Sequence, residues 1–172
     1  MNDVFKEQLI KRKPNTADTM KKVGIIFAAL IILAVPFFVT ALQQYIGMFY
    51  IFLLILVGFG VYMLFSFFNI EYEYAYTNGE LDIDIIYSKS RRKRVFSGTV
   101  KDFEIMVCAL NKEQRMNAQE TRDYSSGTMS PNVFAFLTSY KGKRLKILIE
   151  PNEKMLAAIT ATLSPRKFIK NY

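Results

Sequence analysis

The longest feature of the hydrophobic pattern is a run of 48 residues, 23–70, that contains no Lys, Arg, Asp or Glu. An unpaired charge is costly in lipid, so an apolar run of this length without charges is typical of a membrane segment. The run is too long for one membrane helix and long enough for two. We therefore predict a membrane α-helical hairpin, with transmembrane helices at about 23–42 and 48–68 and a short polar turn at 43–47.

Positive charge before the first span predicts the orientation of this hairpin. Residues 1–22 form a basic tail of net charge +3, whereas the turn at 43–47 carries no positive charge. Because loops rich in Lys and Arg stay on the cytoplasmic side, the tail is expected in the cytoplasm. Two spans return the chain to the same side, so both termini are predicted to be cytoplasmic. The predicted location of the protein is the cell (inner or plasma) membrane. The alternative, a signal peptide cleaved near Val39-Thr40-Ala41, fits less well because a second span follows at once.

The basic tail also offers a candidate contact with the membrane surface. Val4, Phe5 and Leu9 share one face if a short helix forms before Pro14, and such a helix would rest on the inner leaflet. A frayed, solvated tail is the alternative. Five basic side chains of the tail are candidate interfacial residues: Lys11, Arg12, Lys13, Lys21 and Lys22.

After the second span the pattern changes to strict alternation of apolar and polar residues. Residues 71–77 and 80–85 both alternate, and Asn78-Gly79 stands between them. This is the strongest short-range signal of a β-hairpin, because a type I′ turn needs positive φ at both central residues. A two-residue turn places three apolar pairs on one face of the hairpin: Tyr76 opposite Leu81, Tyr74 opposite Ile83 and Tyr72 opposite Ile85.

The other face of the predicted hairpin is acidic. Glu80, Asp82 and Asp84 lie on it at a spacing that would suit a metal or acid–base site. No other type of ligand is near, so alternation alone favours an acidic face in contact with solvent. Glu73 opposite Asp84 would be a like-charge pair, which a basic neighbouring strand would relieve.

The remaining pattern predicts one small α+β soluble domain at 71–172. Further strands are expected at 94–100, 103–110, 133–140 and 144–150. A helix begins at Pro151, has Met155, Leu156, Ile159 and Leu163 at helical spacing, and ends at Ser164-Pro165. We predict a small antiparallel β-barrel or split barrel closed by this C-terminal amphipathic helix.

The longest segment without an apolar period is a loop at 111–132. Loops of this length are functional or disordered in many proteins. The backbone amides near Ser125, Ser126 and Gly127 could bind an anion. A solvated loop without a ligand is the favoured interpretation.

Composition argues against an enzyme. The chain of 172 residues has no His and a single Cys, Cys108, so the commonest general base and the commonest metal ligand are missing. The sequence lacks a Gly-x-Ser-x-Gly motif and a phosphate-binding loop, and no nucleophile–base pair can be named. We therefore expect no catalysis, no cofactor and no metal. One thiol cannot form an internal disulfide, which suits a reducing compartment.

The charge balance narrows the choice of partners. A net charge of +8 and a pI near 9.5 would indicate a nucleic-acid partner in a soluble protein. Here both basic regions flank a membrane anchor, so anionic lipid explains the charge better. We expect membrane lipids as partners and no nucleic acid.

Four stretches carry a resemblance to a known family: 7–14 (EQLIKRKP), 76–84 (YTNGELDID), 102–106 (DFEIM) and 150–156 (EPNEKML). Together with the membrane hairpin, they make the chain similar to a family of two-span membrane proteins from Gram-positive bacteria with a bacterial pleckstrin-homology-like (PH-like) cytoplasmic domain. The similarity covers nearly the whole chain. It implies a PH-like fold, and because the shared motifs are turns and caps, it implies no particular activity.

A membrane-tethered binding module is therefore the favoured function. Its PH-like domain is predicted to contact anionic lipid headgroups, a protein partner of unknown identity, or both. A basic run after the first hairpin supplies the candidate headgroup ligands: Lys89, Arg91, Arg92, Lys93 and Arg94. An ordinary solvated hairpin loop is the alternative for this run. The alternative for the whole protein is a structural accessory subunit of a larger membrane complex.

Overall fold

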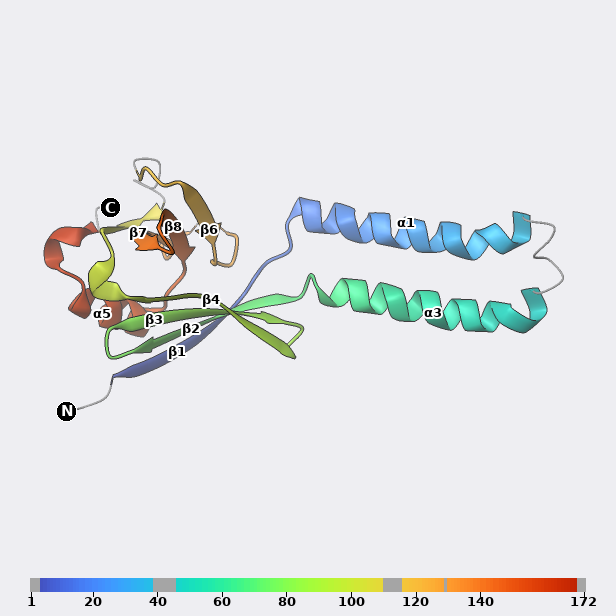
Figure 1. Cartoon of the computed structure of the whole chain (residues 1–172), viewed down its shortest axis with the longest axis horizontal. Helices are drawn as coiled ribbons and strands as arrows, with labels where there is room; N and C mark the ends of the chain where they lie inside the picture. The colour runs from blue at the N-terminus through green and yellow to red at the C-terminus, as the bar shows by residue number, and fades with distance from the viewer. Residues whose placement is uncertain (1–3, 39–45, 110–115, 129, 170–172) are drawn as a thin grey trace. The chain divides into compact units, whose positions relative to one another are not determined.

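The computed structural model describes residues 4–38, 46–109, 116–128 and 130–169. The chain forms two compact units (Figure 1). The helical unit is Pro14–Asn69, and the sheet unit combines Met1–Lys13 with Ile70–Tyr172. The helical unit is therefore an insertion into the sheet unit.

The helical unit contains the helices α1 (Thr16–Phe38) and α3 (Ile46–Ser66). Each holds a stretch that is long and apolar enough to cross a membrane, which fits a two-span protein. α1 begins ahead of the predicted span because Asn15 and Asp18 cap it. The Asp18 N–H donates to Asn15 Oδ1 at 2.8 Å, and the Asn15 N–H donates to Asp18 Oδ2 at 3.3 Å. Most of the predicted turn lies outside the described residues.

The two helices contact each other through aromatic side chains. The Tyr50 hydroxyl donates to the Leu33 carbonyl at 3.3 Å, and the Tyr50 ring meets Phe37 edge-on with the ring centroids 5.3 Å apart. Nearer to the sequence-predicted cytoplasmic ends, the Lys22 ammonium lies 5.9 Å from the centroid of the Phe65 ring. These contacts join α1 to α3 near both ends of the helix pair.

The sheet unit begins with a four-stranded antiparallel sheet in the order β1-β2-β3-β4. Its strands are β1 (Phe5–Lys11), β2 (Ile70–Thr77), β3 (Glu80–Tyr87) and β4 (Arg91–Thr99). The predicted hairpin is confirmed: Asn78 and Gly79 form its turn with φ of 49° and 99°, and all three predicted apolar pairs of β2 and β3 are present. A two-residue turn and strict alternation leave one register that buries these side chains.

A second sheet has five strands in the order β6-β8-β7-β5-β9. Its strands are β5 (Ile105–Cys108), β6 (Glu120–Asp123), β7 (Phe134–Tyr140), β8 (Lys143–Ile149) and β9 (Phe168–Ile169), with short 3-10 helices η1 (Val100–Asp102) and η3 (Pro165–Lys167). β6 pairs with β8 and β9 with β5 in parallel. The predicted antiparallel pairing is therefore present between the other neighbouring strands and wrong for these two pairs, because β6 and β9 arrive by long connections instead of hairpin turns. Strand pairing among the described residues does not continue between the sheets, so no closed barrel is found there.

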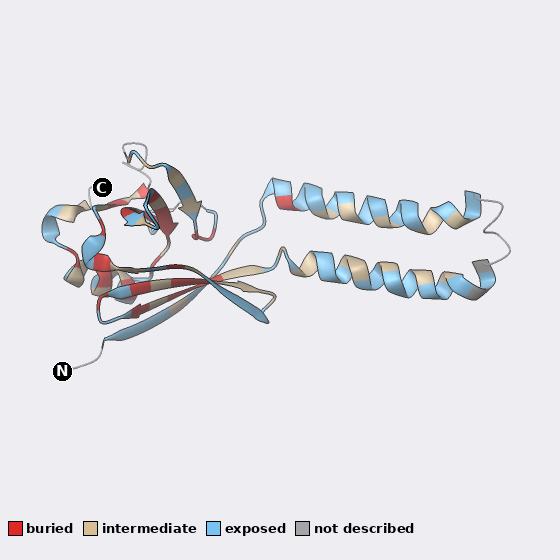
Figure 2. Cartoon of the chain, viewed as in Figure 1, coloured by how far each residue is buried: buried red, intermediate tan, exposed pale blue. Residues whose placement is uncertain are grey.

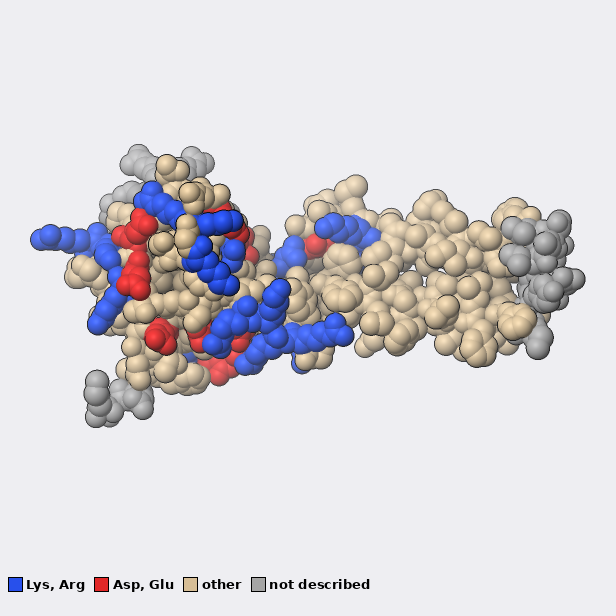
Figure 3. Space-filling model, viewed as in Figure 1, with Lys and Arg blue, Asp and Glu red and all other residues tan. Residues whose placement is uncertain are grey.

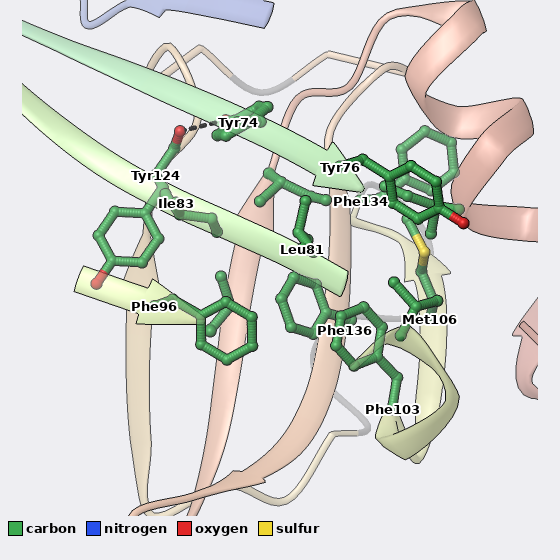
Figure 4. Close-up of a cluster of buried hydrophobic side chains, with 14 of the residues drawn as sticks. Tyr74, Tyr76, Leu81, Ile83, Phe96, Phe103, Met106, Tyr124, Phe134 and Phe136 are labelled. Atoms are coloured by element: carbon green, nitrogen blue, oxygen red, sulfur yellow. Dashed lines mark hydrogen bonds between the residues drawn. The ribbon is translucent and has the colours of Figure 1, made fainter. Parts of the chain in front are cut away.

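Side chains from both sheets form one hydrophobic core (Figure 4). Phe96 of β4 and Phe136 of β7 are almost fully buried, and Phe103 stacks on Phe136 with ring centroids 4.0 Å apart. The predicted C-terminal helix is present as α5 (Glu153–Thr162), and it adds Met155 and Ile159 to the same core. Figure 2 shows that the buried residues concentrate in the sheet unit. This core is what fixes the strand positions used below.

The N-terminal segment is a strand, so the prediction of a short helix or a solvated tail is wrong. β1 pairs with β2 along its whole length, from Phe5 opposite Thr77 to Lys11 opposite Glu71. A helix this short is marginal in water, whereas β2 offers a row of backbone hydrogen-bonding groups. The soluble domain predicted at 71–172 therefore also includes the residues of β1.

The Gln8 side chain ties β1 to the C-terminal part of the sheet unit. Its Nε2 donates to the Glu150 carbonyl at 2.9 Å, and its Oε1 accepts the Asn152 N–H at 2.7 Å. Asn152 is also the N-cap of α5, where its Oδ1 accepts the Met155 N–H at 2.8 Å. β1 thus supports the connection between β8 and α5 as well as pairing with β2.

Candidate functional site

The two outer strands of the first sheet, β1 and β4, and the segments next to them bring basic residues to one end of that sheet. At this end the Arg12 N–H donates to the Ile70 carbonyl at 3.0 Å, Ile70 lies opposite Tyr87, and Tyr87 lies opposite Arg91. The turn between β3 and β4 lies here too, and Figure 3 shows Lys and Arg side chains gathered over this hairpin. Six basic residues at this end form what we call the basic sheet end: Lys11, Arg12, Lys13, Lys89, Arg91 and Lys93. The strand register therefore places at one end of the sheet residues that belong to two separate segments of the sequence.

Most side chains of the basic sheet end face solvent. Lys89, Arg91 and Lys93 are exposed, and no ion pair among the described residues engages them. Arg12 is half-buried. The charges of the three exposed residues are therefore available to an anion from outside the chain.

Arg92 and Arg94 have a different role, although the sequence pattern grouped them with the candidate headgroup ligands. Arg92 forms an ion pair with Glu73, and Arg94 Nε lies 3.0 Å from Asp84 Oδ1. Arg94 Nη1 also lies 3.0 Å from Asp82 Oδ2. β4 is thus the basic neighbouring strand that the sequence pattern called for. Its two arginines offset the repulsion between Glu73 of β2 and Asp84 of β3.

A β-bulge explains why these two arginines meet the acidic residues. Ile83 lies opposite Phe96, but the next residue, Asp84, lies opposite Arg94, so Val95 is an extra residue in β4. Side chains alternate between the faces of a strand, and one extra residue reverses which of them reach each face. The bulge turns Arg94 and Arg92 toward the acidic face and leaves Arg91 and Lys93 on the other.

The acidic face is more buried than the sequence pattern indicated. The side chains of Glu73 and Asp84 are only 7% and 8% exposed. Burial raises the pKa of Glu73; the Arg92 charge opposes this shift and the neighbouring Glu7 charge adds to it. The prediction of a solvated acidic face is thus wrong for these two residues, since the arginines of β4 cover them. Among the described residues no group of His, Cys, Asp or Glu could hold a metal ion.

The turn of the basic sheet end has an unfavourable backbone conformation. Ser88 and Lys89 have φ of 47° and 59°, a region that costs an L-residue roughly 1–2 kcal/mol unless it is Gly or Asn. The other two hairpin turns use Asn78-Gly79 and Lys141-Gly142 at positive φ. A lysine therefore occupies position 89 where a glycine would be more stable.

The remaining candidates from the basic tail, Lys21 and Lys22, belong to the helical unit. Lys22 lies over the rings of Phe65 and Phe68, with the ammonium 5.9 and 5.5 Å from their centroids. Both lysines come just before the apolar part of α1. They fit the role of charges at the edge of a membrane span.

The anion-binding alternative for residues 125–127 is wrong because carboxylates and hydroxyls of the chain occupy the amides. Asp123 Oδ1 accepts the Ser125 N–H at 2.8 Å, and Glu150 Oε2 accepts the Ser126 N–H at 3.0 Å. Ser125 Oγ accepts the Gly127 N–H at 3.1 Å. Ser125 and Ser126 are also buried, so the prediction of a solvated loop is wrong for this part, and 120–123 form the unpredicted strand β6. Residues 111–115 and 129 of that loop lie outside the described residues.

An open pocket of about 500 Å³ lies on the second sheet. Its lining includes Ile105, Leu137 and Ile169, together with an ion pair in which Arg144 Nη2 lies 2.6 Å from Glu104 Oε2. The two charges of this ion pair cancel, so the described lining offers no net charge to a ligand. The sequence pattern gave no sign of this pocket, because the residues that line it come from strands far apart in the chain.

Comparison with known protein families identifies the family of this chain. The family model for a bacterial PH-like domain (DUF6106) matches residues 2–170. No curated protein and no solved structure matches. The match covers β1, both apolar helices and both sheets, so the helical insertion belongs to the family pattern. The chain is therefore a member of the bacterial PH-like domain family DUF6106.

Proposed function

We propose that this protein is a membrane-tethered binding module whose basic sheet end contacts anionic lipid headgroups of the cytoplasmic leaflet. One observation carries the proposal: the strand register collects the exposed basic residues at the sheet end from which the chain continues into both apolar helices. Lys13 is followed by α1 at Thr16, and α3 ends at Ser66, shortly before β2 begins at Ile70. Connections this short keep the basic sheet end within a few residues of each span.

The energy of such a contact is suited to orientation and is not needed for attachment. Each Lys or Arg near an anionic leaflet contributes about 1 kcal/mol, and salt screens this attraction. Two apolar helices already anchor a chain far more strongly. The basic sheet end therefore selects how the PH-like domain stands on the membrane.

The conformation of the β3–β4 turn supports a role for Lys89. Replacing Ser88-Lys89 by Asn-Gly would place preferred residues at both positive-φ positions. That the chain keeps a lysine at a costly backbone position is expected where the side chain itself is used. Backbone strain and exposed charge thus coincide in one turn.

The cytoplasmic location is part of the proposal. Basic residues precede the first span, and the predicted turn between the spans carries none. Pairing of β1 with β2 requires both connections to the helical unit to be on one side of the membrane. With no His in the chain, we propose a binding function without catalysis.

The experiment uses the full-length protein in lipid nanodiscs. A fluorophore on Ser90→Cys in a Cys108→Ser background reports how close the β3–β4 turn is to lipids that carry a nitroxide quencher. We expect stronger quenching in anionic than in neutral nanodiscs, and a decrease in that difference as salt increases. Changing Lys89, Arg91 and Lys93 to Gln should remove the difference. The matched control changes Lys141 and Lys143 of the other basic hairpin turn to Gln and should leave it intact.

Two results would contradict this proposal. Equal quenching in anionic and neutral nanodiscs would show that lipid charge does not attract the basic sheet end. Unchanged quenching in the variant with Gln at positions 89, 91 and 93 would show that other residues make the contact.

A further inference from the structure

β1 is an edge strand, and no strand among the described residues pairs with its outer side. The Arg12 N–H donates to the Ile70 carbonyl, and the Asn78 N–H donates to the Val4 carbonyl. The backbone groups of the even-numbered residues therefore point toward β2, since an antiparallel strand bonds through alternate residues. Those of the odd-numbered residues point away from the sheet: Phe5, Glu7, Leu9 and Lys11.

This outer side is open over the length of β1. No hydrogen bond within the described part of the chain reaches the outward backbone groups of Phe5, Glu7 or Leu9. Beyond the end of β1, the outward N–H of Lys13 has a partner within the chain, since it donates to the Ser126 carbonyl at 2.8 Å. β1 contains no proline and its register with β2 is regular, so it lacks two common devices that protect an edge strand.

The residues whose backbone groups point away from the sheet also expose apolar side chains to solvent, on one face of the sheet. Phe5 and Leu9 are each 57% exposed. Glu7 lies between them and is exposed as well. On the neighbouring strand β2, Glu73 hydrogen-bonds with the Glu7 side chain and has Arg92 as its ion-pair partner. Two adjacent carboxylates thus share one arginine among the described residues, so a further cation beside Glu7 would be attracted.

We propose that the free edge of β1 binds an extended segment of a partner protein by strand addition. The segment places apolar side chains beside Phe5 and Leu9 and a Lys or Arg beside Glu7. Backbone hydrogen bonds to the outward groups provide affinity, and the alternating side chains provide specificity. The site is independent of lipid binding at the basic sheet end.

A second copy of the chain is the other possible occupant of this edge. Antiparallel pairing centred on Leu9 would place Glu7 opposite Lys11, so charge does not exclude it. The twofold axis of such a pair is perpendicular to the sheet, whereas two copies inserted in the same direction in one membrane need an axis along the membrane normal. If the basic sheet end faces the leaflet, the strands run along the membrane normal and the perpendicular to the sheet lies in the membrane plane. The two axes then differ, so membrane insertion and strand pairing between two copies are incompatible. This choice of a partner protein over a second copy rests on the proposed function.

The test places a photo-crosslinking residue at Phe5 (Phe5→p-benzoylphenylalanine) in the full-length protein in its native host. Leu9→Pro removes an outward N–H without removing a hydrogen bond to β2, so it should reduce crosslinking at least tenfold. Leu9→Met keeps the N–H and the apolar side chain and should leave crosslinking unchanged. Glu7→Lys reverses the exposed charge and should also reduce crosslinking at least tenfold, which keeps the test valid if the proline variant fails to fold.

Support requires a reduction in each of these two variants that folds, and a crosslinked partner segment in which apolar and basic residues alternate. The proposal is overturned if no crosslink forms, if either variant folds and leaves the crosslink unchanged, or if the product is two copies of this chain. Gln at positions 89, 91 and 93 should leave the crosslink unchanged, which separates failure of this proposal from failure of the lipid contact.

Discussion

Lys11 lies directly opposite Glu71, although the whole helical unit separates the two residues in sequence. The pairing of β1 with β2 therefore brings together the two points at which the chain enters and leaves the apolar helices. A domain assembled in this way is complete only when residues on both sides of the insertion are present.

The first prediction follows from that relationship. Replacing residues 14–69 by a short glycine-rich linker should give a soluble domain that unfolds cooperatively, because Arg12 and Ile70 are already joined by a backbone hydrogen bond. Deleting residues 1–13 from this protein should lower the free energy of unfolding by about 2–4 kcal/mol, since β2 loses its neighbour and the two hydrogen bonds of Gln8 are lost. Urea denaturation of the two proteins measures the difference. Equal stability would mean that β1 is dispensable.

The second prediction concerns the arginines that cover the acidic face. Arg94→Gln should lower the free energy of unfolding by about 1–3 kcal/mol, because Asp84 is buried and would lose a charged hydrogen-bond donor. Lys93→Gln, one residue away on the other face, should change it by less than about 0.5 kcal/mol. Denaturation of both variants in the linker-joined protein provides the comparison. A loss of the same size in both would argue against the bulge at Val95.

The third prediction concerns the turn of the first hairpin. Gly79→Val should lower the free energy of unfolding by about 1–2 kcal/mol, because Gly79 has φ of 99°. A Cβ there would lie 3.4 Å from Thr162 Cγ2, so a branched side chain has little room. Gly142→Val is the control: its φ of 76° is similar, but nothing lies within 4 Å of a Cβ. We expect a larger loss at Gly79, and the reverse order would exclude a contribution from the contact with Thr162.

The register of β2 and β3 could be predicted because every determinant is local. Asn78-Gly79 fixes the length of the turn, and alternation fixes the faces, so Tyr74 opposite Ile83 follows from a few adjacent residues. The existence of two apolar helices could be predicted for a similar reason, since absence of charge is a property of the segment alone.

Two other features could not be predicted because their causes are distant in sequence. Residues 5–11 form a strand through pairing with β2, and their own pattern fits a short helix nearly as well. The roles of Arg92 and Arg94 depend on one extra residue, Val95, in β4. Without that bulge, alternation would place Arg91 and Lys93 on the acidic face, and nothing in the basic run indicates where the extra residue lies.

The last prediction concerns alkaline pH and the tyrosines of β2. Burial raises the pKa of Tyr72 to about 12, partly opposed by the positive charge of Arg12. Burial also raises the pKa of Tyr74. An unfolded tyrosine loses its proton near pH 10. From about pH 10 upward the unfolded chain therefore binds fewer protons than the folded chain, and the free energy of unfolding must fall as pH rises.

Up to about pH 10 the free energy of unfolding should not change with pH through Tyr72 or Tyr74, because both are protonated in the folded and in the unfolded chain. The loss of stability that Tyr72 causes should develop between about pH 10 and pH 12. For Tyr72 alone the shift corresponds to about 3 kcal/mol once the pH exceeds the pKa in the folded protein. Tyr72→Phe should remove that share and make the free energy of unfolding less sensitive to pH in this range. The residual dependence includes Tyr74 and Tyr124, whose pKa values burial also raises. Urea denaturation at several pH values, followed by tyrosinate absorbance, measures both effects. A free energy of unfolding that stays constant to pH 12, or that falls equally in the Tyr72→Phe variant, would show that the Tyr72 hydroxyl ionises in the folded protein as easily as in the unfolded chain.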